Sequence, residues 1–301
     1  MISISPCNLC PRLCGADRNS ARGRCGASAD IEVSHIMLHH WEEPPISGTD
    51  QSRGSGTIFF THCPLGCVYC QNGKISRRDC RGRTYTVREL ADAMLKLQDE
   101  GAYNINFVSP TQYTAQIIEA VKIAKADGLI LPIVWNTGGY ERKEVIDELY
   151  DTVDIYLTDF KYASSTLAGE YSSAEDYPET AARVLSKMYS AVGKYTIGED
   201  GMMRRGVIVR HLVLPSHRDD SINVLQRIAD IVPPADVLLS LMAQYTPEFL
   251  PTVSGEDKYA KIRRKVTSFE YKKVIEEAAR LGFEGFSQER SSATKRFTPD
   301  F

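Results

Sequence analysis

The sequence predicts an α/β fold in which short apolar strands alternate with amphipathic helices. Six strands are expected, at 56–60, 104–108, 129–137, 153–160, 206–214 and 237–245. A helix is expected after each strand, beginning at Thr86 and then at 114–126, 141–150, 178–192, 219–231 and 268–281. The strands are short apolar runs, typical of strands covered on both faces. Such a series gives a doubly wound sheet or a barrel, complete or partial, and the pattern does not decide between them.

The first of these helices carries the clearest local signals. Thr86, followed three residues later by Glu89, forms a capping box at its start, and Gly101 suits its end. Its apolar face is formed by Leu90, Ala93, Met94 and Leu97. We therefore expect this helix to pack against the sheet.

Polar side chains follow the predicted strands at their carboxyl ends, where both architectures place their chemistry. These residues are Cys63, Ser109, Thr111, Asn136, Asp159, Lys161, His211 and Gln244. All eight side chains are expected to lie close together, at the end of the sheet or barrel where the strands terminate. Alternation along the strand lets only one of Arg210 and His211 enter a barrel. The long connections at 161–177 and 246–267 leave strand ends, so they could be lids or substrate loops, or equally inert insertions.

Composition excludes several classes of protein. The chain has 301 residues, 43% of them hydrophobic and 25% charged, enough for one large domain or two small ones. A net charge of -3 and a pI of about 6.1 argue against nucleic-acid binding. No stretch resembles a membrane span, and "MISISPCNLC" lacks the regions of a secretory signal. We expect a cytoplasmic protein without nucleic-acid or membrane partners.

Seven of the eight cysteines fall into two tight clusters. They are Cys7, Cys10, Cys14 and Cys25, and then Cys63, Cys67 and Cys70. In a reducing cytosol clustered cysteines indicate metal ligands rather than disulfides, and the missing secretory signal disfavours a disulfide-bonded secreted protein. Cys80 stands apart and is interpreted as a free thiol. His62, beside Cys63, is expected in a solvated loop.

The stretch "HCPLGCVYCQN" (62–72) holds three cysteines with the spacing C-x3-C-x2-C. Thiolates are the usual ligands of iron–sulfur clusters, and a [4Fe-4S] cluster has four irons to coordinate. Three cysteines leave one iron open to a small molecule, as a catalytic zinc keeps an open position. The alternative is a zinc site that recruits a cysteine from elsewhere.

C-x3-C-x-aromatic-C after the first strand resembles the motif of the radical S-adenosylmethionine (radical SAM) superfamily. The resemblance implies that SAM chelates the open iron and that an electron from the reduced cluster cleaves its sulfonium. The resulting 5′-deoxyadenosyl radical would abstract hydrogen from a substrate. No side chain stands out as a general base, and hydrogen-atom abstraction needs none. The superfamily also implies a partial (β/α)6 TIM-type barrel.

A closer resemblance covers nearly the whole chain. "CPLGCVYCQN", "TDFKY" and "VRHLVLPSH" are similar to the pyruvate formate-lyase activating enzyme family. "HHWEEPPISGTDQSRGSGTIFF", "NFVSPTQY" and "LMAQYTP" resemble an uncharacterised branch of it. The resemblance implies a flavodoxin- or ferredoxin-type electron donor and a protein substrate, a glycyl radical enzyme. Alternatives are a small molecule or another peptide as substrate, or a non-catalytic metal-binding or redox-sensing protein.

The resemblance also assigns SAM contacts position by position. Asp159 and Lys161 match the D-x-K motif that helps to hold SAM, and Arg210 matches an arginine near its carboxylate. Asn136 lies where a polar residue contacts SAM, and Tyr69 would approach the adenine through its backbone. The Gly-Gly-Glu stretch common after the second strand is replaced by "VSPTQY" (108–113). Ser109, Thr111 or Gln112 could take over its role, or backbone carbonyls alone could suffice.

The first cysteine cluster, with spacing C-x2-C-x3-C-x10-C, can close a tetrahedral site unaided. Structural zinc is the first interpretation and a second iron–sulfur cluster the rival, because ligand spacing does not separate the two metals. We expect an N-terminal cysteine-rich metal-binding extension and lead-in over 1–50, and the radical SAM barrel over 51–301.

Overall fold

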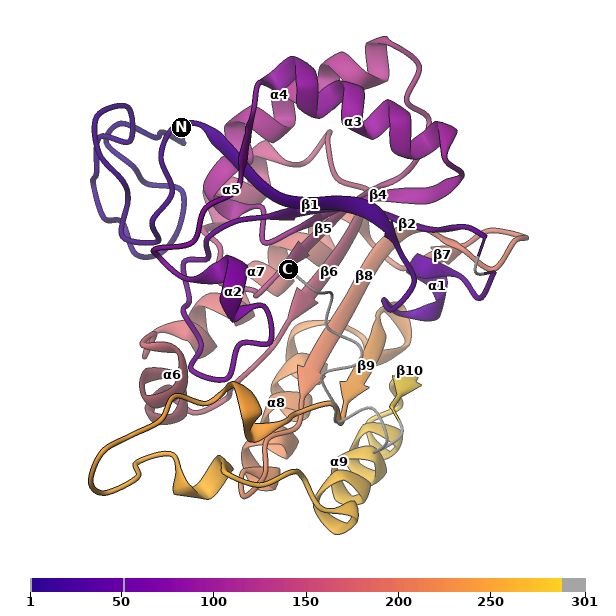
Figure 1. Ribbon diagram of the computed structural model, residues 1–301. Coiled ribbons are helices and arrows are strands. Elements are labelled where there is room, and N and C mark those ends of the chain that lie inside the picture. Colours follow the sequence, from indigo (N-terminus) through magenta and orange to yellow (C-terminus); the bar gives the residue numbers. More distant parts are fainter. Residues whose placement is uncertain (1, 51, 289–301) are drawn as a thin grey trace.

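A computed structural model describes residues 2–50 and 52–288 (Figure 1). Seven parallel strands form its central sheet: β2 (Gly54–Phe60), β4 (Ala102–Val108), β5 (Ile133–Thr137), β6 (Ile155–Asp159), β8 (Met203–Leu212), β9 (Leu238–Met242) and β10 (Glu284–Ser287). They neighbour one another in chain order, without the reversal of a doubly wound sheet. The α/β fold with a mostly parallel sheet is confirmed. The linear order within the described residues is consistent with a partial barrel.

Four strands were not expected from the sequence: β10, at the edge of the parallel sheet, and three others. β1 (Ile31–His39) lies antiparallel to β2, β3 (Arg83–Tyr85) pairs with β1, and β7 (Thr196–Ile197) pairs with β8. Residues 31–39, expected to be a lead-in, are thus part of the sheet. The predicted domain boundary at residue 50 stays a prediction.

Six helices follow the parallel strands on the outer side of the curved sheet (Figure 1). They are α3 (Val87–Asp99), α4 (Thr114–Ala126), α5 (Lys143–Glu148), α7 (Tyr177–Val192), α8 (Arg218–Ile231) and α9 (Ser268–Arg280). The capping box of Thr86 and Glu89 forms as predicted. The connections at 161–177 and 246–267 contain α6 (Ser165–Ser172) and two short 3-10 turns, respectively.

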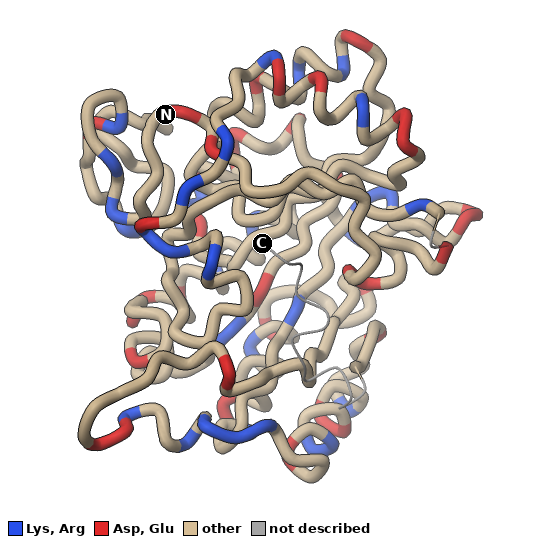
Figure 2. The backbone as a smooth tube through the Cα atoms, viewed as in Figure 1, with Lys and Arg blue, Asp and Glu red and all other residues tan. Residues whose placement is uncertain are grey.

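Acidic and basic residues are interspersed along the outer helices α3 and α4 (Figure 2). Such mixing of the two signs produces no extended field of one charge on these helices. Among the described residues, no helix combines the length and the hydropathy that a bilayer span requires.

The inner face of the sheet is closed at the amino-terminal ends of the strands by α1 (Pro44–Ser47). Ile46 of this short helix is fully buried among apolar side chains of the inner face: Val134, Ile155, Leu157, Met203, Ile208 and Leu238. Asn104 Nδ2 donates to the Ile46 carbonyl over 2.7 Å. Because side chains alternate along a strand, the next inward positions are Asn136, Asp159, Arg210 and Ser240. We call the space in front of these residues the lumen.

Candidate functional site

The three cysteines of the motif lie on the loop that leaves β2, which we call the cluster loop (61–72). Cys67 is buried, and Cys63 and Cys70 are half-buried. Ser172 Oγ donates to Cys67 Sγ over 2.9 Å, and Ser76 Oγ lies 3.3 Å from Cys70 Sγ. Hydrogen bonds to sulfur tune the potential of an iron–sulfur cluster. The donor set and its surroundings therefore fit a thiolate-bound cluster.

Burial raises the pKa of two of the loop thiols, Cys63 and Cys67. Burial, followed by the neighbouring Cys67 and Cys70, raises the pKa of Cys63 to about 12. Among the residues that the structure describes, no three or more Cys, His, Asp or Glu side chains already converge on one point, as a metal site would require. Binding of a cluster therefore requires the thiols to rotate toward a common centre and to release protons.

Tyr69, the aromatic residue of the motif, is buried and anchors the cluster loop. Its hydroxyl lies 2.5 Å from that of Tyr162, which in turn lies 2.8 Å from Ser172 Oγ. Its ring packs edge-on against Tyr245. Because the hydroxyl is engaged within the protein, only the backbone of Tyr69 remains for the predicted adenine contact, which stays a prediction.

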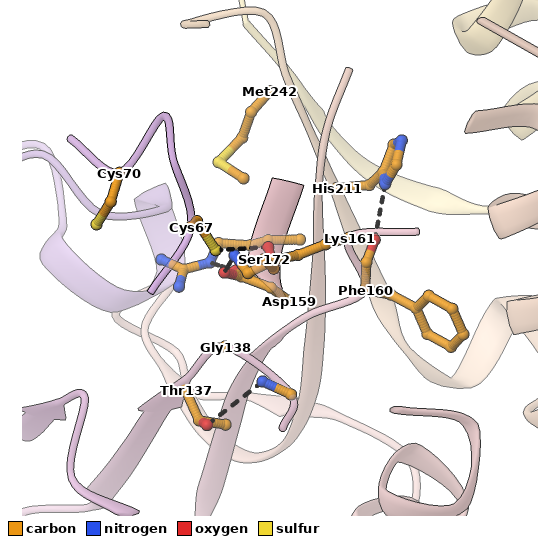
Figure 3. A network of polar contacts seen from close by, with 12 residues as sticks. Cys67, Cys70, Thr137, Gly138, Asp159, Phe160, Lys161, Ser172, His211 and Met242 are labelled. Atoms are coloured by element: carbon orange, nitrogen blue, oxygen red, sulfur yellow. Dashed lines mark hydrogen bonds and ion pairs between the residues drawn. The ribbon is translucent and has the colours of Figure 1, made fainter. Parts of the chain in front are cut away.

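Four of the predicted SAM-contacting residues form one charged network at the carboxyl ends of β5, β6 and β8, and Figure 3 shows Asp159 and Lys161 from it. Asp159 forms an ion pair with Lys161 and accepts a hydrogen bond of 2.8 Å from Arg210 Nε. Arg210 Nη2 donates to Asn136 Oδ1 over 2.6 Å. Burial alone would raise the pKa of Asp159, but Arg210 and Lys161 hold it below its ordinary value. Asp159 is therefore a carboxylate.

Two members of this network were missed by sequence reasoning. Glu42 Oε2 lies 3.3 Å from Arg210 Nη1, and its Oε1 accepts hydrogen bonds from Asn106 Nδ2 and Asn136 Nδ2 over 3.2 and 3.1 Å. The acidic pair beside two prolines in "HWEEPP" and the asparagines inside an apolar strand were the available signals. The lumen is therefore lined by charged side chains from the segment that follows β1 as well as from the ends of the parallel strands.

The residues that replace the Gly-Gly-Glu stretch lie on both faces of the sheet. Thr111 Oγ1 donates to Glu141 Oε1, which also accepts from Thr137, a residue that alternates with the inward-facing Asn136. Thr111 therefore lies on the helix side of the sheet. Ser109, with a φ of 56°, stays at the strand end, where its amide donates to the Asn136 carbonyl over 2.9 Å. Their SAM contacts stay predictions.

Only one of Arg210 and His211 was expected to enter the barrel, and the structure places Arg210 at the lumen. His211 points away from the lumen, with Nδ1 2.7 Å from the Phe160 carbonyl (Figure 3). The expectation of a solvated His62 is wrong, because the ring is fully buried with Nε2 3.3 Å from Glu32. Its Nδ1 lies 3.4 Å from Cys80 Sγ, so the Cys80 thiol, which stands apart from the other cysteines in the sequence, has a histidine beside it.

The four N-terminal cysteines line one small cavity of about 20 Å3, together with Pro64 of the cluster loop. A methyl group placed on Gly23 would lie 3.7 Å from the sulfurs of both Cys14 and Cys25. A cavity of this size holds about one water-sized sphere. The four thiols match the donor set of a tetrahedral zinc site, and like those of the cluster loop they would have to turn toward a common centre to bind an ion.

Arg12 connects this cysteine-rich segment to the cluster loop. Its guanidinium donates to the carbonyls of Pro64 and Leu65 over 3.0 and 3.3 Å, and to those of Ser172 and Ser173. Pro64 and Leu65 lie between Cys63 and Cys67, and Ser172 donates to Cys67. One side chain of the N-terminal segment therefore fixes the backbone on two sides of the cluster cysteines.

Substitution of Arg12 by alanine should loosen the cluster loop. Charge-assisted hydrogen bonds contribute about 1.5–3 kcal/mol each, so losing several should speed iron release to a chelator by at least about tenfold. The measurement is the rate of iron loss from anaerobically reconstituted protein. Arg78→Ala, at an exposed arginine nearby, is the control and should leave the rate unchanged. Equal rates for all three proteins would contradict this role.

Comparisons with known proteins agree with this geometry. Residues 57–198 match the sequence model of the Radical SAM superfamily. The uncharacterized protein MJ0674 of Methanocaldococcus jannaschii is 28% identical over 290 residues, covering 92% of this chain and 75% of that protein.

Two solved structures are similar. A radical SAM methyltransferase from Sphaerobacter thermophilus has a TM-score of 0.52 at 14% identity, covering 78% of this chain and 66% of that one. A domain of pyruvate-formate lyase-activating enzyme from Bacteroides vulgatus has a TM-score of 0.43 at 13% identity, covering 60% of this chain and 94% of that one. The first likeness supports the fold, and the second is too low to assign the chain to the activating-enzyme branch.

Proposed function

We propose that this chain, whose residues 57–198 match the model of the radical SAM superfamily, cleaves SAM at a [4Fe-4S] cluster held by Cys63, Cys67 and Cys70. When bound, cluster and SAM would supply a 5′-deoxyadenosyl radical that takes a hydrogen atom from the substrate. The observation that carries the proposal is the three-thiol loop at the carboxyl end of β2, beside the Asp159–Lys161–Arg210 network.

The residues of this chain would bind and orient SAM, while the cofactors carry the radical chemistry. Asp159, Lys161, Arg210 and Asn136 would hold its polar groups. Ser109 and the backbone of Tyr69 would add further contacts, and Thr111 would do so only after its hydroxyl leaves Glu141. We propose a flavodoxin- or ferredoxin-type protein as the electron donor and the cytoplasm as the location.

The test is formation of 5′-deoxyadenosine. The protein is reconstituted anaerobically with iron and sulfide, reduced, and mixed with SAM, and the nucleoside is quantified by mass spectrometry. We expect nucleoside that requires both the reductant and the reconstituted cluster. Cluster-loaded, reduced protein that yields no more nucleoside than the unreconstituted chain would overturn the proposal. That result would favour a non-catalytic metal-binding or redox-sensing protein. The Asp159–Lys161–Arg210 network argues against this alternative, because such a protein needs no SAM site.

The size of the lumen favours a small molecule as the substrate. A pocket of about 480 Å3 opens beside Arg210, within the range of small-molecule sites. Activation of a glycyl radical enzyme is the second candidate and rests on the sequence resemblance. Incubation with a protein encoded beside this one would separate the two, because activation leaves a glycyl radical detectable by electron paramagnetic resonance (EPR).

For the N-terminal cysteines we propose a single zinc ion. The four cysteines lie within nineteen residues of one another and line one small cavity, which suits a single ion held by four thiolates. The test is metal analysis of a variant with Cys63, Cys67 and Cys70 all replaced by alanine. We expect one zinc per chain and no sulfide, and loss of the zinc on the further substitution Cys14→Ser. Iron with inorganic sulfide in the triple variant would instead support a second cluster.

A further inference from the structure

The charged groups of the lumen do not pair off completely. Glu42, Glu43 and Asp159 contribute three carboxyl groups, and Lys161 and Arg210 contribute two cations. Lys161 pairs with Asp159, and Arg210 pairs with Asp159 and Glu42. Within the described parts of the chain, Glu43 has no ion-pair partner. The lumen therefore holds three carboxyl groups but only two cationic side chains.

Glu43 has a buried, unsatisfied oxygen in this region. The residue is only 9% exposed, and its Oε2 accepts no hydrogen bond from any residue that the structure describes. It borders the pocket of about 480 Å3 together with Trp41, Arg210, Ser240, Met242 and Gln244. A buried polar atom without a partner is costly, and it is common where a ligand supplies the partner.

The partner that an ionised Glu43 would take is a donor. Asn106 Oδ1, in the same network, is a second buried acceptor without a partner among the described residues. Its amide nitrogen donates to Glu42, so its oxygen is the free atom. Burial raises the pKa of Glu43, and the nearby charge of Arg210 lowers it only in part. The nitrogens of Arg210, by contrast, already donate to Asp159, Glu42 and Asn136.

We propose that this pocket binds the substrate through a cationic nitrogen group, an ammonium or a guanidinium, that pairs with Glu43. This rests on the proposed function, because it names the substrate class of the same site. Trp41 and Met242 provide apolar and aromatic walls for the carbon stem, and a cation is also attracted to an indole face. Ser240 and Gln244 add polar groups beside the stem.

The test is binding of three matched probes to the reconstituted, SAM-loaded protein: butylammonium, butyrate and 1-butanol, each followed by calorimetric titration. We expect butylammonium to bind at least about tenfold more tightly than butyrate or 1-butanol. Glu43→Gln should remove that preference. Glu141→Gln is the matched control, because Glu141 is equally buried but lies on the helix side of the sheet.

Equal or tighter binding of butyrate by the unaltered protein would overturn the inference, and so would a preference that survives Glu43→Gln. The comparison of the three probes needs no variant, so it decides even if Glu43→Gln fails to fold. Failure of the proposed function is a separate result. In that case the unaltered protein forms no 5′-deoxyadenosine, whatever probe it binds.

Discussion

We expect that replacing Cys67 with alanine will remove the proposed [4Fe-4S] cluster and the formation of 5′-deoxyadenosine. Two remaining thiolates cannot hold three irons of the cluster, and Cys67 is the buried member that accepts the hydrogen bond from Ser172. Loss of a group that hydrogen-bonds to a metal ligand already lowers metal affinity or activity by about 10–100-fold. Loss of the ligand itself should therefore lower nucleoside formation by more than about 100-fold. Iron content and nucleoside yield are measured on the same samples.

Cys80→Ala is the matched control for that variant. Cys80 lies beside His62 and is not one of the three motif cysteines. The control should keep its iron and form nucleoside at the rate of the unaltered protein. Retention of the cluster by Cys67→Ala, or an equal loss in Cys80→Ala, would show that the cluster is not held as proposed.

Asp159→Asn has the second large expected effect. The side chains of Asp159, Lys161 and Arg210 are 13%, 17% and 15% exposed. Removing the shared carboxylate leaves two cations without their partner, and breaking a buried ion pair costs about 3–5 kcal/mol. We expect the free energy of unfolding, measured with urea, to fall by about that amount. SAM binding should weaken as well, because Lys161 and Arg210 lose their fixed positions.

The effect of Asp159→Asn has a defined pH dependence. The pKa of Asp159 is lowered in the folded protein, so its contribution to stability is fully present above the pKa of an unfolded aspartate, about 3.9. That contribution is lost as the pH falls through the lower, folded value. The difference from the unaltered protein should stay constant at neutral pH and shrink below about pH 4.

The control for Asp159→Asn is an exposed ion pair. Asp200 and Arg204 form a pair in which both side chains are more than 40% exposed. Exposed pairs contribute about 0–1 kcal/mol, so Asp200→Asn should change the free energy of unfolding by less than about 1 kcal/mol. Similar losses in the two variants would contradict the role assigned to the buried network.

The sequence predicts the parallel sheet well because its signals are local. Each of the six expected strands overlaps an observed one, since apolar runs and helix caps depend on residues close in the chain. β1 was missed although Ile31 and Val33 alternate with polar residues, because it was interpreted as a lead-in. β3, β7 and β10 are only two to four residues long and give too little pattern to detect.

The site was predicted only where a motif or a strand end indicated it. Asp159, Lys161, Arg210 and Asn136 come together as expected because parallel strands end at one edge. Glu42 was missed because its contact with Arg210 joins positions 168 residues apart. The contacts of Arg12 likewise depend on how the N-terminal segment lies against the cluster loop. No periodicity or spacing carries such information.

The most direct test of the central claim, that SAM completes a cluster held by three thiolates, is the EPR spectrum of the reduced protein with and without SAM. The account predicts a reduced [4Fe-4S] signal whose g-values shift when SAM is added, because SAM occupies the open iron. A reduced-cluster signal that does not change in excess SAM, or the absence of any cluster signal after reconstitution, would contradict the account.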